Sequence, residues 1–316
     1  MPRLDKRAAN ALVWLLLLAA PYWLPMIGGY VELGSRIVIM ALAAMALNFL
    51  LGFTGVLSFG HAAYFGLAAY GTAATMKYLY PSTPLAMLIG IVIATAAAAL
   101  VGPLIVRLRG VYFAMCTIAF GQVFYFIAFR WRTFTGGDDG LTAWHRTPID
   151  LGFVNLDILT SNKAFYYWVL IIFAVATGVM AFLLHSPFGR TLLAIRENER
   201  RARFLGIPVD RHIWVSWVIS CFFVSVAGSL YALLNDFVDP RAVRWDMSGT
   251  FVIMAVLGGM RSFWGPLIGA AIFLVLEDYV SSRTENWESF IGLFFVLIVL
   301  FFPRGVLGIL RRRSAT

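Results

Sequence analysis

Long apolar stretches separated by short polar ones run along almost the whole chain of 316 residues. A helix needs about 20 residues to cross roughly 30 Å of hydrocarbon. Ten stretches approach or reach that length: 11–27, 33–51, 61–79, 84–106, 110–129, 164–184, 213–235, 248–259, 264–280 and 287–303. The pattern therefore predicts an all-α, polytopic integral membrane protein with about ten transmembrane or re-entrant helical segments. We expect residues 1–316 to form a single membrane-spanning domain.

The composition agrees with this pattern, because 61% of the residues are hydrophobic and only 13% are charged. A soluble domain carries about 25% charged residues. The net charge of +9 comes from basic residues at the ends of apolar stretches rather than from one patch. The positive-inside rule explains this arrangement, so we expect no nucleic-acid partner. Cys116 and Cys221 lie inside apolar stretches and are expected to pack as small hydrophobes.

The distribution of charge also predicts the topology. The basic N-terminus precedes an apolar run in which Ala19–Ala20 before Pro21 is a poor cleavage site, so an uncleaved first helix is favoured over a signal peptide. Arg107 and Arg109, the arginine-rich residues 185–211 and the basic C-terminus then fall on the same side as the N-terminus. We expect this side to be cytoplasmic, with both termini inside and an acidic loop at 130–163 outside.

Residues 185–211 form the one long, strongly charged segment, and it lies between two apolar spans. Ser186 is a suitable N-cap, Pro187 suits the first helical position, and Gly206 followed by Pro208 predicts a stop. A single amphipathic helix would place an apolar stripe on one face, made of Phe188, Leu192, Ile195, Ala202 and Leu205. Its opposite face would carry Arg190, Arg196, Arg200, Arg201 and Arg203.

A short amphipathic helix on the cytoplasmic side of such a protein docks either a soluble partner or the lipid surface. The helix caps, the interrupted apolar stripe and the polar triplet Glu197, Asn198 and Glu199 favour a specific protein groove over anionic lipid. The segment is therefore the first candidate for a functional site.

The stretch from Gly52 to Gly71 interrupts the apolar pattern with glycines and polar residues. Non-helical backbone at membrane depth survives only where it is buried in protein or lines a wet cavity. One interpretation is a discontinuous helix beside a solute path, in which Ser58 caps a helix beginning near Gly60. The other is tight helix packing through small residues. The candidate path residues are Asn48, Gly55, Ser58, Gly60, His61 and Gln122.

Hydrogen bonding within the protein is the competing interpretation for the polar members of this set. A lone buried histidine such as His61 is more often a structural residue than a proton carrier. Asn48 and Gln122 are uncharged amides that suit interhelical hydrogen bonds as well as a path. The sequence therefore leaves both readings of these residues open.

A second glycine-rich stretch, from Val256 to Ala271, resembles the first. Each contains Gly-x-x-Ser-Phe, at 55–59 and at 259–263, followed by a glycine and a helix of small residues. This similarity suggests a diverged internal repeat, a feature common in transporters. Two glycine-rich turns can also agree by chance.

Several kinds of chemistry are missing from the sequence. No acidic residue falls convincingly at the centre of a predicted span, although ion-driven carriers and pumps usually need one. Phosphate-loop, His-Glu-x-x-His and Cys-x-x-Cys motifs are absent, and the four histidines form no visible cluster. The Gly-Gly-Asp-Asp run at 136–139 is interpreted as a solvated turn. We therefore expect no metal site and no catalytic residue.

The residues resemble those of the permease subunits of branched-chain amino acid ABC importers, of the LivM type. The similar stretches are 48–71 (NFLLGFTGVLSFGHAAYFGLAAYG), 110–121 (GVYFAMCTIAFG), 135–141 (TGGDDGL), 186–209, 258–277 (GGMRSFWGPLIGAAIFLVLE) and 303–310 (PRGVLGIL). They spread over most of the chain. The Ser-Phe-Gly-His-Ala-Ala block and the Arg-Glu-Asn-Glu run are the most specific parts.

This resemblance implies a subunit of the bacterial inner membrane that forms a path for branched-chain or similar hydrophobic amino acids. It implies pairing with a second, related permease, two cytoplasmic ABC ATPase subunits, and a periplasmic solute-binding protein. ATP and magnesium would bind to the ATPases, so the chain would be no enzyme and need no cofactor. Residues 130–163 would be periplasmic, and transport would proceed by alternating access.

The resemblance also makes 185–211 a coupling helix seated in an ATPase cleft. ABC importers generally carry Glu-Ala-Ala-x-x-x-Gly there, and the aligned residues here include Arg200, Arg201, Ala202 and Gly206. The alanine and glycine match, whereas two arginines replace the Glu-Ala start. We therefore expect an acidic rim on the ATPase cleft.

Two alternatives remain beside this interpretation. A self-contained secondary carrier or channel would act without an ATPase, and the break at 52–60 is the only candidate for a filter-like loop. An ABC permease for urea or short amides would share the architecture but carry other cargo.

Overall fold

The computed structural model describes residues 6–26, 28–142, 144, 147, 149–150, 155–156, 161–260, 262–301 and 305–306. Each predicted apolar stretch coincides with a helix: α1 (Lys6–Met26), α2 (Val31–Thr54), α3 (His61–Ala74), α4 (Thr83–Ile105), α5 (Val111–Arg130), α7 (Asn162–His185), α10 (Val209–Asn235), α11 (Trp245–Gly258), α12 (Gly265–Ser281) and α13 (Trp287–Phe301). The prediction of an all-α membrane protein is confirmed. The basic ends of the chain and much of the predicted loop 130–163 lie outside the described residues.

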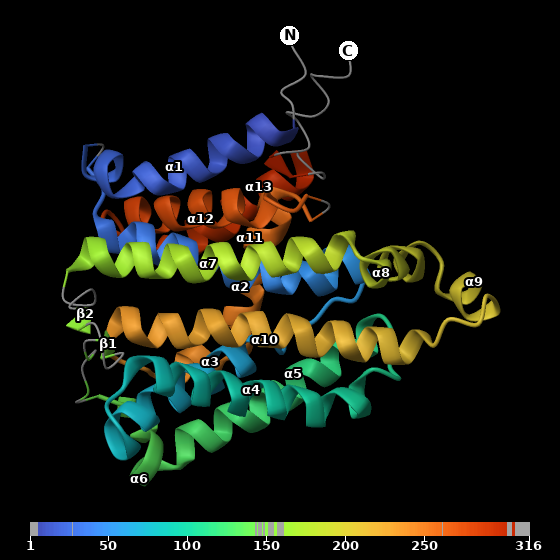
Figure 1. Ribbon diagram of the computed structural model, residues 1–316, viewed down its shortest axis with the longest axis horizontal. Coiled ribbons are helices and arrows are strands. Elements are labelled where there is room, and N and C mark those ends of the chain that lie inside the picture. Colours follow the sequence, from blue (N-terminus) through green and yellow to red (C-terminus); the bar gives the residue numbers. More distant parts are fainter. Residues whose placement is uncertain are drawn as a thin grey trace.

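The remaining elements are short. They are the π-helix η1 (Thr75–Leu79), which continues α3, the helices α6 (Arg132–Thr135), η2 (Gly137–Asp139), α8 (Pro187–Glu197), α9 (Glu199–Phe204) and η4 (Pro240–Val243), and the strands β1 (Ile149–Asp150) and β2 (Asn155–Leu156). The two strands pair antiparallel. They are a small local exception to the all-α prediction, and they lie at the end of the bundle opposite α8 and α9 (Figure 1).

The helices lie side by side along the long axis of the molecule, and α8 and α9 extend beyond one end (Figure 1). Five described helices are long and apolar enough to cross a membrane: α2, α4, α5, α7 and α10. Of their most apolar windows, 83% is buried in α2 and 72% in α10, but only 28–39% in the other three. The core of the bundle is therefore built around α2 and α10, while α4, α5 and α7 present apolar side chains suited to lipid.

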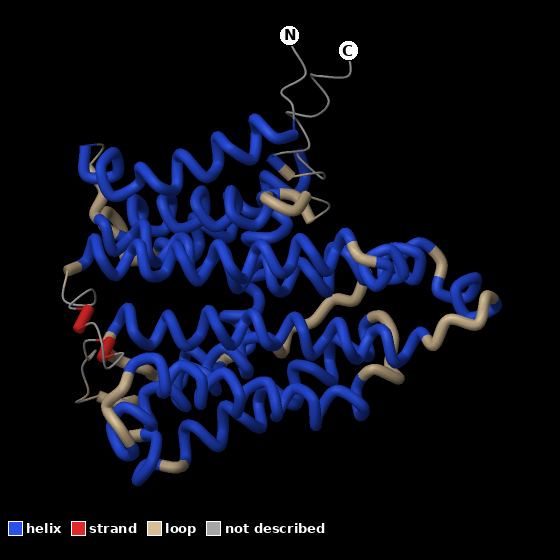
Figure 2. The backbone as a smooth tube through the Cα atoms, in the orientation of Figure 1, coloured by secondary structure: helices blue, strands red, loops and turns tan. Residues whose placement is uncertain are grey.

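Two helix pairs are interrupted within the bundle, as Figure 2 shows by the loop segments between them. Residues 55–60 separate α2 from α3, and residues 259–264 separate α11 from α12. With 14 residues, α11 is as short as the sequence indicates. Ser58 and Gly60 of the first interruption and Gly259 of the second are buried, as irregular backbone at membrane depth requires, whereas Gly55 is exposed.

The prediction of one continuous helix over 185–211 is wrong. Ser186 does cap a helix beginning at Pro187, because its hydroxyl accepts from the amide of Gly189. That helix ends at Glu197, and Asn198 adopts an extended conformation (φ −158°, ψ 97°). The Asn198 side chain then accepts from the amide of Arg201 and caps a second helix, α9. The asparagine therefore breaks the segment by competing for the backbone donors of the helix that follows it.

The predicted stop at Gly206 is present. Gly206 has a φ of +79°, a conformation that favours glycine, and the amide of Ile207 bonds back to the carbonyl of Ala202. The break at Asn198 changes which residues are buried. Leu192, Ile195 and Ala202 are buried as expected, but Leu205 is 75% exposed. The predicted apolar stripe thus holds along α8 and fails at its last member.

Candidate functional site

The first interruption begins where α2 ends. Gly55 takes a left-handed conformation (φ +81°), and its amide bonds to the carbonyl of Leu50. A side chain there would also meet Arg196, whose Cγ lies 2.9 Å from the position of a Cβ on Gly55. Both the backbone conformation and the close neighbour require glycine, so the turn at Gly55 is built into the sequence.

His61, the first residue of α3, is fully buried and bonded through both ring nitrogens. Its Nε2 lies 2.8 Å from Ser220 Oγ, and its Nδ1 lies 3.0 Å from Ser58 Oγ. Ser220 donates its own proton to the carbonyl of Ala46 at 2.5 Å, so it must accept from Nε2–H. These contacts place a proton on Nε2, and in the neutral tautomer Nδ1 accepts from the Ser58 hydroxyl.

The remaining polar groups of the interruption are bonded to neighbouring helices. Ser58 Oγ accepts from the amide of Gly60 at 3.2 Å, rather than from an amide further into α3. The amide of Ala62 instead donates to Ser248 Oγ of α11 at 2.8 Å. Ser248 therefore occupies one of the backbone donors at the start of α3. The amide of Phe59 donates to Thr117 Oγ1 of α5 at 3.2 Å.

Gly60 lies against the backbone of α5. A Cβ on Gly60 would approach the carbonyl oxygen of Thr117 to 2.7 Å. Gln122 is half-buried on the same helix, but it makes no hydrogen bond to the other candidate path residues in the described part of the chain. The structure therefore brings Gly55, Ser58, Gly60 and His61 together and leaves Gln122 apart.

Asn48 joins the two interruptions. Its Nδ2 donates to the carbonyl of Ser262 at 3.4 Å, and a Cβ on Gly52 would lie 2.3 Å from Asn48 Oδ1 and 2.2 Å from the carbonyl oxygen of Met260. Asn48 Oδ1 is buried and accepts no hydrogen bond within the described part of the chain. The second interruption thus packs directly on α2, one turn before the first begins.

Arg196, in the last turn of α8, links this region to the charged loop. Its guanidinium donates to the carbonyl of Gly52. The last carbonyls of a helix lack partners within that helix and carry partial negative charge, so an arginine is well suited to this position. The sequence placed Arg196 on the solvent face with the other arginines, whereas the structure turns it toward the interruption.

Four charged residues anchor α9 to the bundle. Arg109 in the α4–α5 loop donates through Nε to both carboxylate oxygens of Glu199, at 2.8 and 2.9 Å, and also bonds to Asp210 at the start of α10. Arg203 bonds to the same two acids, at 3.0 Å to Glu199 and 2.8 Å to Asp210. Burial alone would raise the pKa of the Glu199 carboxyl, but the hydrogen bonds from Arg109 and Arg203 outweigh it and hold that pKa below its ordinary value.

The other predicted coupling residues lie around this anchor. Arg190, Glu197, Asn198, Arg200, Arg201 and Gly206 are exposed, Arg196 and Glu199 are half-buried, and Ala202 is buried. Sequence reasoning missed the apolar tip of the loop, where Phe204 is 91% exposed and Leu205 75% exposed. Two large apolar side chains next to exposed arginines form a surface that suits a protein partner with an apolar pocket and an acidic rim.

The bundle, its interrupted helix pairs and the charged loop define a membrane permease. The chain matches the family described as branched-chain amino acid transport system / permease component over residues 29–300, and it belongs to that family.

Its relatives include two kinds of permease protein. It is 27% identical over 95% of its length, and 75% of the relative, to the high-affinity branched-chain amino acid transport system permease protein LivM of Escherichia coli (strain K12). It is 23% identical over 84% of its length, and 89% of the relative, to a probable LivM of Methanocaldococcus jannaschii. It is also 32% identical to the E. coli permease protein LivH, over 45% of this chain and 46% of that protein. No solved structure matches the chain significantly.

Proposed function

We propose that this chain is the LivM-type permease subunit of an ABC importer, and that it forms part of the path for branched-chain or similar hydrophobic amino acids. The family and the named transport systems of the relatives support this cargo. The same chain resembles both LivM and LivH proteins, which supports pairing with a second, related permease. Two ATPase subunits and a periplasmic binding protein complete the proposed complex.

ATP hydrolysis falls to the ATPase subunits, which bind ATP and magnesium, so this chain acts without catalysis and without a cofactor. The exposed loop of α8 and α9 is the proposed docking surface. Its end of the bundle then faces the cytoplasm, together with both termini, and the end with β1, β2 and η4 faces outward. The bacterial inner membrane is the location that this orientation fits.

In the proposed mechanism, the contact between Arg196 and Gly52 transmits movement from the charged loop to the bundle. A movement of α8 driven by the ATPase acts directly on the last turn of α2, and through Asn48 it reaches the second interruption. The proposed path lies beside the residues that this movement displaces, namely Asn48, Gly55, Ser58, Gly60 and His61, with Gln122 further along α5. Alternating access then follows from two arrangements of the interrupted helices.

The test is a mild-detergent pull-down of the tagged chain from its native membrane, followed by mass spectrometry and leucine uptake in proteoliposomes. We expect a second permease, an ATPase with a phosphate-loop motif, and ATP-dependent uptake of leucine. Recovery of the chain alone, in a detergent that preserves other membrane complexes, would replace this proposal with a self-contained carrier or channel. Uptake of urea or acetamide in preference to leucine would retain the importer and change its cargo.

A further inference from the structure

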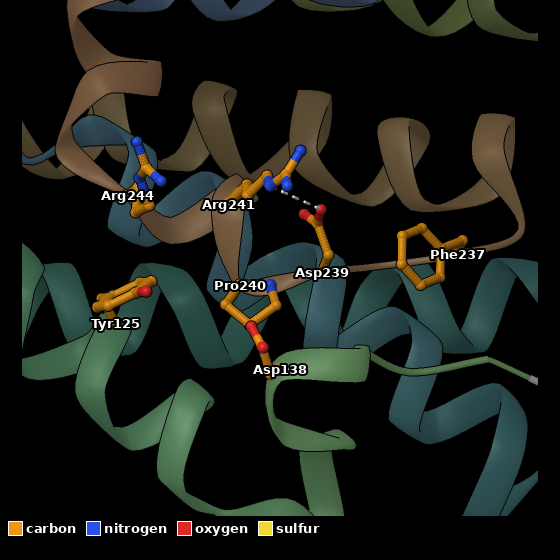
Figure 3. A pocket seen from close by; sticks show the side chains of 7 residues that line it. All are labelled: Tyr125, Asp138, Phe237, Asp239, Pro240, Arg241 and Arg244. Atoms are coloured by element: carbon orange, nitrogen blue, oxygen red, sulfur yellow. Dashed lines mark ion pairs between the residues drawn. The ribbon is translucent and has the colours of Figure 1, made fainter.

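A cavity of about 470 Å³ lies at the end of the bundle opposite α8 and α9. Its walls come from α5, η2, the loop after α10 and η4, and Figure 3 shows the side chains that line it: Tyr125, Asp138, Phe237, Asp239, Pro240, Arg241 and Arg244. The volume falls within the range of small-molecule sites, about 300–1,000 Å³. The cavity is separate from the candidate path residues described above.

The walls of the cavity are held in place by the Thr-Gly-Gly-Asp-Asp-Gly-Leu turn at 135–141. Gly136, Gly137 and Gly140 all have positive φ, so the turn depends on residues without a side chain. Leu141 and Val238 exchange both backbone hydrogen bonds, at 2.7 and 3.3 Å, which ties this turn to the loop after α10. The turn that sequence reasoning assigned to solvent thus forms one wall of a pocket.

Charges of both signs line the cavity in equal number. Arg241 and Asp239 are 4.0 Å apart, and the Arg241 side chain is 84% exposed, so this pair is loose. Arg244 makes a closer pair with Asp246, at 2.9 Å. Asp138 lies on the opposite wall from the two arginines (Figure 3), and the ion pairs made by the described lining residues are those of Asp239 with Arg241 and of Asp246 with Arg244. An exposed ion pair contributes little, about 0–1 kcal/mol, so a ligand can replace it at small cost.

A second observation comes from the helix beneath the cavity. Tyr70 of α3 is buried, and its hydroxyl bonds to no group in the part of the chain described. Tyr70 is not one of the lining residues, but its helix α3 packs against η4, which supplies Pro240 and Arg241 to the cavity wall. A buried polar group without a partner is costly, so this hydroxyl is an unsatisfied polar group on the helix behind that wall.

We infer that this cavity is a receiving site for the zwitterionic head group of an amino acid on the outer side of the permease. The ammonium group lies against Asp138 and Asp239, and the carboxylate lies against Arg241 and Arg244. Tyr125, Phe237 and Pro240 flank the aliphatic side chain. The inference rests on the proposed function and narrows its cargo, because opposed charges select a zwitterion, whereas urea or a short amide carries no charge to match them.

The experiment measures ligand binding to the purified permease–ATPase complex in nanodiscs, without the binding protein, by saturation-transfer NMR. The probes are L-leucine, L-leucinamide, which lacks the carboxylate, and 4-methylpentanoate, which lacks the ammonium group. We expect leucine to bind about tenfold more tightly than either analogue, since each lost charge-assisted hydrogen bond is worth about 1.5–3 kcal/mol. Leucine uptake by the same complex with its binding protein is measured in parallel.

Two variants test which side chains bind the carboxylate and which bind the ammonium group. Arg241→Gln should weaken leucine binding about tenfold and leave leucinamide unchanged, whereas Asp138→Asn should weaken leucine and leave 4-methylpentanoate unchanged. Arg283→Gln is the matched control, because Arg283 lies beyond α12 and stacks on Tyr279 outside the cavity. A merely structural defect would weaken all three probes together.

Two results would overturn the inference: equal binding of the three probes, or unchanged leucine binding in both variants. If the complex takes up leucine normally in either case, only the receiving site is rejected. If the wild-type complex takes up no leucine at all, the proposed function itself fails.

Discussion

The two interruptions share a local sequence but differ in what surrounds them. Gly55 and Gly259 both follow directly on a helix and both have positive φ, at +81° and +110°. Around the second, α11 and α12 pack on each other so closely that a Cβ on Gly258 would lie 1.7 Å from the carbonyl oxygen of Gly265. Around the first, α10 packs against both α2 and α3. The same sequence pattern therefore accompanies a tight hairpin in one place and a separated pair of helices in the other.

The side chains differ in the same way. At the first interruption, the hydroxyl of Ser58 bonds to His61 and to the amide of Gly60. At the second, the backbone carbonyl of Ser262, rather than its hydroxyl, accepts a hydrogen bond from Asn48. Within the described residues, the charged loop reaches the first interruption through Arg196, which lies against Gly55 and donates to the carbonyl of Gly52 just before it. We therefore expect the second interruption to hold α11 and α12 in a fixed arrangement, and the first interruption to change its arrangement during transport.

The largest effect is expected at the tight hairpin. Gly269→Leu places a side chain where the carbonyl oxygen of Met254 would lie 1.8 Å from its Cβ. Because backbone cannot move aside cheaply, we expect a loss of more than about 4 kcal/mol and no protein in the membrane fraction. Gly249→Ala, on the same hairpin but with no neighbour within 4 Å, is the control on a membrane immunoblot. Normal levels of Gly269→Leu would show that the hairpin can open.

A large functional effect is expected at Arg196. Arg196→Gln removes the guanidinium from the carbonyl of Gly52 while leaving the docking face of the loop in place. We expect solute-stimulated ATP turnover to fall about tenfold with the complex still assembled, since a hydrogen bond from a charged group is worth about 1.5–3 kcal/mol. Arg190→Gln, on the exposed side of α8, should retain normal turnover. Equal turnover in the two variants would remove Arg196 from the coupling mechanism.

A moderate effect on stability is expected at Ser58, and a smaller one at Ser262. Ser58→Ala leaves Nδ1 of His61 and the amide of Gly60 without a partner, so we expect a loss of about 1–3 kcal/mol in stability. Ser262→Ala retains the carbonyl that Asn48 uses, so its change should stay within about 0.5 kcal/mol. Thermal unfolding of the purified variants in one detergent measures both. A larger shift for Ser262→Ala would reverse the contrast drawn between the interruptions.

The smallest effect is expected from lowering the pH, which should weaken the attachment of α9 to the bundle. The pKa of Glu199 is held below its ordinary value of 4.5, so its contribution to holding α9 is present above that pH and is lost as the pH falls through the lowered pKa. Hydrogen exchange measured from pH 6 down to pH 3, corrected for intrinsic rates, should show residues 198–206 losing protection before residues 259–264 do. Glu199→Gln should show the reduced protection already at pH 6. Simultaneous loss in both regions would argue for global unfolding instead.

Much of this architecture could be predicted from the sequence. The apolar lengths indicated the helices, and the glycine and cap residues indicated both interruptions, the start at Ser186 and the stop at Gly206. The break at Asn198 could not be predicted, because a local side-chain cap and the bonds from Arg109 to Glu199 decide it, and those partners lie 90 residues apart in the chain. The direction of Arg196 was missed for the same reason.

The partners of the candidate path residues show the same limit. His61 and Ser58 were recognised because they are polar residues three positions apart in a glycine-containing break of the apolar pattern. Ser220 and Ser248, which bond to His61 and to the start of α3, lie inside apolar helices, and α10 carries three further serines at 216, 225 and 229. Nothing in their immediate sequence distinguishes them from other small residues on those helices. Only the packing of α10 and α11 against α3 reveals their role.

The exposed tip of the charged loop also bears on the life of the protein before assembly. Phe204 and Leu205 stand in water at the end of the molecule until a partner covers them. An unassembled subunit therefore exposes an apolar surface that promotes aggregation and recognition by quality-control proteases. Under the proposed function, ATPase binding buries this end, so we expect the abundance of the permease to depend on the supply of the ATPase.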